Sequence, residues 1–115
     1  MRTVIFILAI LALASLAFSA DLSLKATWTP NTESDMASYK LYRTDVTRSL
    51  IGTIPHPPAL PYAFVVTIPA NTEGTLQFVL TALDTKGNES ADSNTVAYPF
   101  DLKPPAAPGG FGVSN

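Results

Sequence analysis

Apolar and polar residues alternate along most of the chain after residue 20, which is the pattern of β-strands with one buried face. The clearest example covers residues 22–29, where every second position from Leu22 to Trp28 is apolar. The same alternation predicts further strands over residues 36–43, 50–54, 64–68, 75–84 and 93–98. No stretch of a dozen residues in this region has the three- and four-residue apolar spacing of a helix. We therefore expect an all-β domain of two packed antiparallel sheets.

Turn-forming residues separate the expected strands. Pro30 and Asn31 end the first strand, and Gly87 and Asn88 mark a turn before the last one. The segment 55–61, with the sequence PHPPALP, is expected to be an extended and solvated connector because proline favours that conformation. The only histidine of the chain, His56, lies in this connector and is expected to be exposed.

The first twenty residues differ from the rest of the chain. Arg2 precedes an unbroken apolar run over residues 4–14, and Ala17 and Ser19 have the spacing of the −3 and −1 positions of a signal-peptidase site. We therefore expect a signal peptide over residues 1–20, cleaved after Ser19 or Ala20, and an exported, periplasmic or extracellular protein. The alternative is an uncleaved membrane anchor, although the run is shorter than the roughly 20 residues of a full span. No stable membrane span is expected once the leader is removed.

Composition narrows the classes of partner. The formal net charge is −2, and without Arg2 six lysines and arginines remain against nine acidic residues, giving a charge of −3. A weakly acidic chain without a basic cluster is a poor ligand for nucleic acid or anionic lipid. The chain has no cysteine, so neither disulfides nor a cysteine-bound metal can stabilise it. The domain must rely on its hydrophobic core.

A series of short segments is similar to the fibronectin type III family, and to its bacterial secreted members in particular. The similarity covers residues 22–98 and is carried by the segments 28–30 (WTP), 39–42 (YKLY), 66–69 (VTIP), 78–84 (FVLTALD) and 87–90 (GNES). The resemblance implies an immunoglobulin-like antiparallel β-sandwich. It makes Trp28 the central core aromatic of strand B and Tyr39 its neighbour on strand C.

The chain departs from this family at two places. Strand F of the family usually opens with a tyrosine that ties down the preceding corner, whereas this chain has Leu76, so we expect packing alone to hold the corner. The family also begins with a strand A, whereas the polar part of this chain is expected to start directly at strand B. We therefore expect a sandwich without strand A over residues 21–102, followed by a proline- and glycine-rich tail over residues 103–115. That tail resembles the linker and first strand of a next repeat.

No arrangement of residues indicates catalysis. A histidine in a proline-rich connector is poorly placed to activate a serine, and a glycine-rich phosphate loop would need a helix that the chain lacks. The acidic residues are interpreted as surface charge. We therefore expect a protein that is not an enzyme and requires no cofactor.

Two candidate binding regions remain. Glu33 and Asp35 lie in one loop and Asn88 and Glu89 in another, and the resemblance places both loops at the same pole. Their oxygen atoms are weak candidates for a calcium site, since turns favour such residues without any metal. The second region is the outward face of strands C and F, which carries Tyr42, Val79 and Leu83. It is either a recognition surface or ordinary strand composition.

Two functions of different classes are consistent with the sequence. The first is a non-catalytic module for binding or spacing, whose partner is a protein or a carbohydrate. Trp28 is assigned to the core, so few aromatic residues are left for sugar stacking. The second is a self-associating structural protein, in which Phe111 and Val113 of the tail supply the missing edge strand of a neighbouring molecule.

Overall fold

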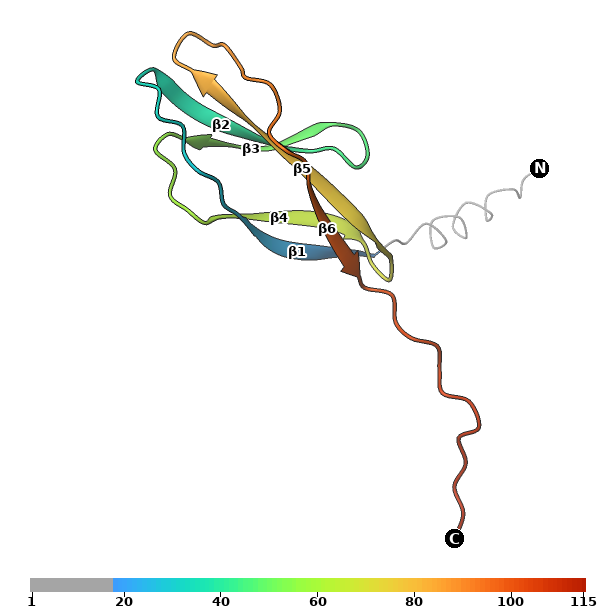
Figure 1. The fold of residues 1–115 in the computed structure, drawn as a ribbon. Helices are drawn as coiled ribbons and strands as arrows, with labels where there is room; N and C mark the ends of the chain where they lie inside the picture. Colours follow the sequence, from blue (N-terminus) through green and yellow to red (C-terminus); the bar gives the residue numbers. More distant parts are fainter. Residues whose placement is uncertain (1–17) are drawn as a thin grey trace, which may run out of the picture.

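Residues 18–115 are described by the computed structural model and form an all-β domain followed by an extended tail (Figure 1). The strands are β1 (Ser19–Ala26), β2 (Met36–Arg43), β3 (Ser49–Pro55), β4 (Tyr62–Pro69), β5 (Glu73–Asp84) and β6 (Val96–Asp101). This part of the chain contains no helix, so the predicted all-β class is confirmed. The predicted signal peptide, residues 1–20, lies mostly on residues 1–17, outside the described residues; its last two residues, Ser19 and Ala20, form the beginning of β1.

The strands form two antiparallel sheets. β1 pairs with β4 in a two-stranded sheet, while a four-stranded sheet has the order β3-β2-β5-β6. The buried core draws its side chains from both sheets, so the two layers pack face to face as a sandwich. The core residues are Tyr39, Leu41, Ile54, Val66, Ile68, Leu76 and Phe78. Apart from Ile54, they lie on the strand faces whose apolar alternation indicated burial.

The first strand is shifted relative to the prediction. The alternation indicated residues 22–29, whereas β1 begins at Ser19 and ends at Ala26. It begins early because Ser19 and Ala20 pair with Pro69 and Ile68 of β4. Trp28 follows the strand and packs partly buried against the core, with its ring edge-on to Tyr39 at 5.1 Å between centroids. The two aromatic residues are neighbours, as expected, but the expectation that Trp28 is the central core aromatic of a strand is wrong, because it lies beyond β1 and is only partly buried.

The last strand begins later than predicted because two serines replace its first part. Ser90 and Ser93 each donate their backbone N–H to a carbonyl of β5, as strand residues would. Their hydroxyl oxygens then accept hydrogen bonds from the backbone N–H of Ala82 and Leu80, both at 2.9 Å. The hydroxyls thus occupy the place of partner carbonyls, and regular pairing starts only at Val96.

The corner between β4 and β5 is held by hydrogen bonds, so the prediction of packing alone is wrong. Leu76 is fully buried next to the corner, as expected. In addition, the Thr72 hydroxyl donates to the Pro69 carbonyl at 2.7 Å, and Asn71 adopts the left-handed conformation with φ of 62°. A threonine hydroxyl and a turn asparagine therefore do locally what a tyrosine would do from the following strand.

The beginning of β1 and the end of β6 lie at the same corner. Ala70 donates its N–H to the Phe18 carbonyl at 3.1 Å, and Leu102 donates its N–H to the Thr72 carbonyl at 2.8 Å. We call this end of the domain the turn pole. The opposite end, which holds the loops 27–35 and 85–95, is called the loop pole. β1 and β6 consequently run in opposite directions.

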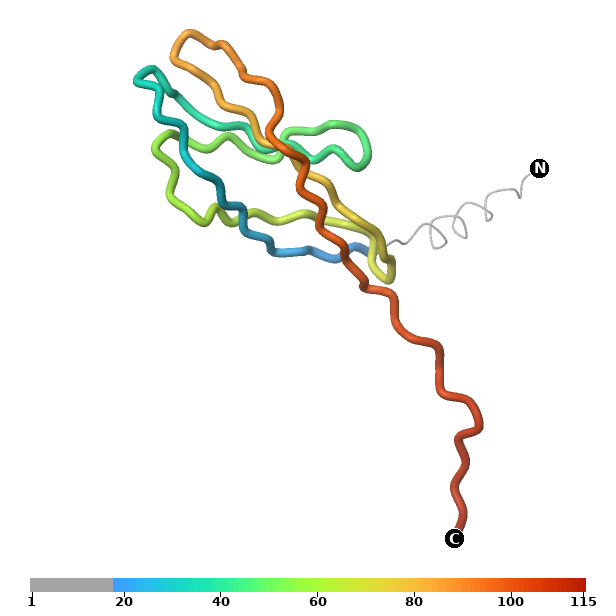
Figure 2. The backbone as a smooth tube through the Cα atoms, viewed as in Figure 1, coloured from blue at the N-terminus to red at the C-terminus, as the bar shows by residue number. Residues whose placement is uncertain are grey.

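The tail leaves the domain at the turn pole and extends away from it (Figures 1 and 2). All residues from 103 to 115 are exposed, and none belongs to a strand. Phe111 and Val113 each have 86% of their surface exposed, which is unusual for large apolar side chains.

Candidate functional site

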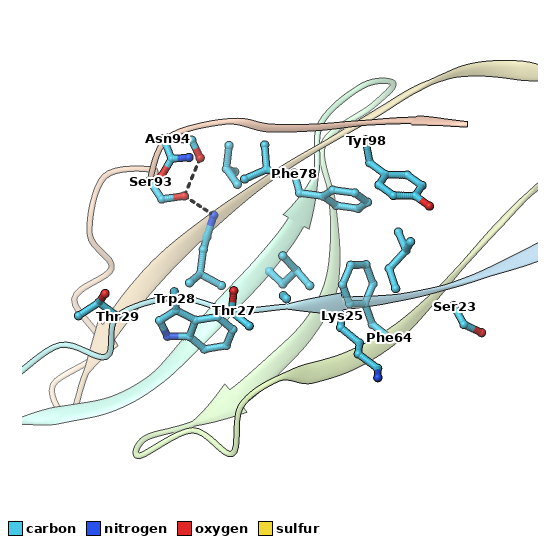
Figure 3. A pocket seen from close by; sticks show the side chains of 16 residues that line it. Ser23, Lys25, Thr27, Trp28, Thr29, Phe64, Phe78, Ser93, Asn94 and Tyr98 are labelled. Atoms are coloured by element: carbon cyan, nitrogen blue, oxygen red, sulfur yellow. Dashed lines mark hydrogen bonds between the residues drawn. The ribbon is translucent and has the colours of Figure 1, made fainter. Parts of the chain in front are cut away.

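An apolar groove of about 570 Å³ runs between β1 and β6, which are edge strands of different sheets. Its walls come from β1 and β6 and its floor from β5. Figure 3 shows Trp28 and Ser93 at one end of the groove and Ser23 and Tyr98 at the other. The large apolar side chains that line it are Leu24, Trp28, Phe64, Phe78, Val96 and Tyr98. The groove therefore opens the core of the sandwich to solvent along one side.

One wall of the groove is a strand with an unpaired edge. β1 pairs with β4 alone, and the Phe18 carbonyl is directed toward β4 because it accepts the Ala70 N–H. Backbone groups in an antiparallel strand alternate in direction from one residue to the next. Asp21, Ser23 and Lys25 therefore direct their N–H and C=O groups away from β4, along the free edge. Within residues 18–115 this edge has no strand partner.

The apolar surface in the groove is only partly covered. Leu24, Trp28 and Phe64 pack against the core without being fully buried. On the opposite wall, Val96 is 53% and Tyr98 is 42% exposed. An exposed apolar strip beside a free strand edge is a liability that proteins usually cover.

The other side of the sandwich is bridged by one side chain. β4 and β3 are edge strands there and do not pair, but the Tyr62 hydroxyl of β4 lies against Gly52 of β3, where a side-chain carbon would overlap with it. The connector 56–61 joins these two strands at the loop pole. The opening of the core thus lies on the side of β1.

The outward face of β2 and β5 is not the exposed patch that the sequence indicated. Val79 is 5% and Thr81 is 3% exposed, while Tyr42 and Leu83 are half-buried. The prediction is wrong for Val79 because the neighbouring loops fold over this face and cover it.

Four side chains hold these loops on the sheet, and we call them the outer latch: Tyr42, Arg48, Glu89 and Asp92. The Arg48 guanidinium lies 4.1 Å from the centre of the Tyr42 ring and pairs with both carboxylate oxygens of Asp92 at 2.9 Å. Glu89 accepts hydrogen bonds from the Tyr42 hydroxyl at 2.6 Å and from the Thr81 hydroxyl at 2.7 Å. These bonds hold the pKa of Glu89 below its ordinary value, with the Tyr42 hydroxyl as the main cause. The face is therefore closed by polar contacts.

The candidate calcium ligands lie at one pole, and the side chains of Asn88 and Glu89 are engaged in other contacts. Thr85 donates its N–H to the Asp35 carbonyl at 2.9 Å, so the two loops do meet as predicted, and Glu33 and Asn88 line a shallow hollow between them. Glu89, however, belongs to the outer latch. Nowhere in residues 18–115 do three or more histidine, cysteine or acidic side chains gather closely enough to hold a metal ion. The arrangement thus gives no support to a calcium site.

His56 is half-buried, so the prediction of an exposed loop side chain is wrong. Its Nδ1 lies 2.9 Å from the hydroxyl of the buried Tyr39, and that hydroxyl also accepts the Asn31 N–H at 2.8 Å. Sequence reasoning missed this contact, although a signal for it existed. The alternating pattern predicted that Tyr39 is buried, and a buried hydroxyl group requires hydrogen-bond partners.

The comparisons with protein-family models, curated proteins and solved structures find no match to this chain. No helix long and apolar enough to cross a membrane occurs between residues 18 and 115. The groove, with its free strand edge, is the candidate binding site of the described residues.

Acid is expected to weaken the outer latch. A carboxylate whose pKa is lower in the folded than in the unfolded protein stabilises the fold at pH values above its unfolded pKa, which is 4.5 for Glu89. That stabilisation is lost as the pH falls through the lower pKa that Glu89 has in the folded protein. Glu89→Gln should therefore be less stable than the unchanged protein at pH 7, and the difference should shrink on going well below pH 4.5.

Urea unfolding at neutral and at acidic pH measures this effect. Glu73→Gln, at the exposed start of β5, is the matched control, and it should keep the pH dependence of the unchanged protein. Equal pH dependence in Glu89→Gln and in the unchanged protein would show that Glu89 does not stabilise the fold through its charge.

Proposed function

We propose that this chain is an exported, non-catalytic β-sandwich module of the fibronectin type III kind, which binds an extended peptide segment along the free edge of β1. The observation that carries this proposal is the groove, because it combines an unpaired strand edge with partly exposed apolar side chains. Each of these features is incomplete without a partner.

An extended peptide is the ligand that satisfies both features at once. Along the free edge, N–H and C=O groups recur at every second residue, and a further strand supplies groups with the same repeat. In strand addition, these main-chain bonds provide affinity, and pockets for alternate side chains provide specificity. The half-exposed Leu24, Phe64 and Tyr98 are suited to apolar side chains of such a peptide.

A carbohydrate fits the molecule less well. Sugar-binding sites use exposed aromatic rings as platforms, but Trp28 packs against the core and Tyr42 lies beneath Arg48. Tyr98 is the half-exposed aromatic residue in the groove wall, while Phe111 lies far along the tail. These rings do not gather into one platform.

Two further observations support a non-catalytic module of the fibronectin type III kind. The order β1-β4 facing β3-β2-β5-β6 is the arrangement expected of a fibronectin type III sandwich whose first strand is missing. The only histidine of the chain, His56, contacts the hydroxyl of the buried Tyr39, which gives it a structural role. Export rests on the leader predicted from the sequence.

Selection of displayed random peptides tests this function. The target is the chain from residue 18 to 115, which holds every described strand, with Phe111→Asp to remove the apolar tail as a competitor. Selected peptides should carry apolar residues spaced two apart. Their affinity should fall at least about tenfold when Ser23→Pro is added, since proline removes an N–H from the free edge.

Val65→Pro is the matched control for this experiment. Val65 lies in β4 with its backbone directed to the other edge, so both substitutions place proline where its nitrogen faces away from the sheet partner. Both variants should keep the circular dichroism spectrum of the unchanged protein. The proposal is refuted if no peptide binds above background, or if Ser23→Pro binds the selected peptides as well as Val65→Pro does.

A further inference from the structure

The direction of the tail decides which groove it is able to fill. β6 ends at the turn pole, where β1 begins, and the tail continues away from the domain at that pole (Figure 1). To enter the groove of its own molecule, the tail would have to reverse and run in the same direction as β1. The resulting pair would be parallel, whereas every strand pair in this domain is antiparallel.

A tail that arrives from a second copy has the opposite direction. If it enters at the loop pole, near Trp28, and runs toward the turn pole, it lies antiparallel to β1. Pro104, Pro105 and Pro108 stiffen the preceding segment, which favours an extended course over a reversal. At about 3.1 Å per residue, the linker 102–108 spans roughly 20 Å between two domains.

The end of the tail has the composition that the groove requires. Phe111 and Val113 are two residues apart, so in an extended strand their side chains point to the same face. Gly110 and Gly112 alternate with them, which leaves the opposite face without side chains. Residues 104–115 carry no charged side chain, in keeping with the apolar lining of the groove. In the tail's own molecule, Phe111 and Val113 are almost fully exposed.

We propose that residues 109–113 of one copy add to β1 of the next copy as an antiparallel strand, with Phe111 and Val113 directed into the groove. This inference rests on the proposed function, since it names the peptide that the free edge binds. Donor and acceptor are different surfaces at different poles, so the contact is heterologous and repeats from copy to copy. The assembly is a head-to-tail chain.

Light scattering coupled to size-exclusion chromatography measures the assembly of residues 18–115. The mass should grow from low micromolar to near-millimolar concentration. Phe111→Asp places a charge in the groove, and Ser23→Pro blocks the free edge. Each variant should lower the association constant at least about 30-fold, as expected for a residue at the centre of an interface. Val65→Pro and Ser114→Asp, the matched controls for the edge and for the tail charge, should assemble like the unchanged protein.

Mixing the two defective variants provides the decisive observation. Phe111→Asp keeps an intact groove, and Ser23→Pro keeps an intact tail, so together they should form a dimer of one copy each. This dimer should not grow further with concentration, because its remaining tail and groove are the defective ones. A symmetric interface that used both surfaces on both copies would not be restored in this way.

The outcomes separate this inference from the function on which it rests. If the unchanged protein is a monomer at every concentration while selected peptides still bind at β1, the inference fails and the peptide-binding function stands. If neither occurs, both fail. Assembly that persists in Phe111→Asp, or a mixture that stays monomeric, would also overturn the inference.

Discussion

Leu76→Ala is expected to destabilise the domain by about 2–5 kcal/mol, the range for a leucine removed from a rigid core. Leu76 has no exposed surface and lies in β5, between β2 and β6. The hydrogen-bonded corner before it and its pairing with Tyr98 of β6 limit how far the structure can close around a cavity. Urea unfolding followed by tryptophan fluorescence measures the loss, because Trp28 packs against the same core.

Leu50→Ala is the matched control for this prediction. Leu50 is 52% exposed in β3, so the same substitution there removes little buried surface and should change stability by no more than about 0.5 kcal/mol. A similar loss at both positions would contradict the assignment of Leu76 to the centre of the core.

Tyr39→Ala is expected to have a comparable or larger effect, about 3–5 kcal/mol. The ring is 1% exposed and packs against Trp28, and its hydroxyl is bound to Asn31 and His56.

Tyr39→Phe separates the contribution of the ring from that of the hydroxyl, since it keeps the ring and removes the hydroxyl. It should cost about 1–3 kcal/mol, because it leaves the Asn31 N–H and the His56 ring without their partner.

A double-mutant cycle tests whether His56 acts through Tyr39. His56→Ala and Tyr39→Phe remove opposite ends of the same hydrogen bond, so the double variant should be more stable than the sum of the two losses indicates. Urea unfolding of the four proteins gives the interaction energy. Additive losses would show that the contact between these two side chains contributes nothing of its own.

The strands could be predicted from the sequence because alternation is a local signal. The stretch around Tyr39 and Leu41 gave β2 with its correct bounds, and the run before Asp84 gave most of β5. The missing partner of β1 was also foreseeable, since the family resemblance indicated an absent first strand. Within residues 18–115 β1 pairs with β4 alone, while the family membership and the absent first strand stay predictions.

Features that depend on contacts distant in sequence could not be predicted in this way. Val79 alternates like an exposed residue, but it is buried on the face where the outer latch joins residues distant in sequence, such as Arg48 and Asp92, 44 residues apart. The two serines before β6 were likewise invisible, because a hydroxyl in the place of a carbonyl leaves no pattern of alternation. The groove itself depends on how far the two sheets stand apart, which no local pattern encodes.

The position of both strand ends at the turn pole has a mechanical consequence. A force that pulls apart the beginning of β1 and the end of β6 acts at one end of the sandwich, so it would separate β1 from β4 and β6 from β5 one pair at a time, beginning at the turn pole. In a head-to-tail chain the force would enter at the loop pole and leave at the turn pole. It would then act along the strands and strain many hydrogen bonds at once. The same domain would thus unfold at low force when it is pulled by its own two ends, and at higher force when it is pulled as one member of a head-to-tail chain.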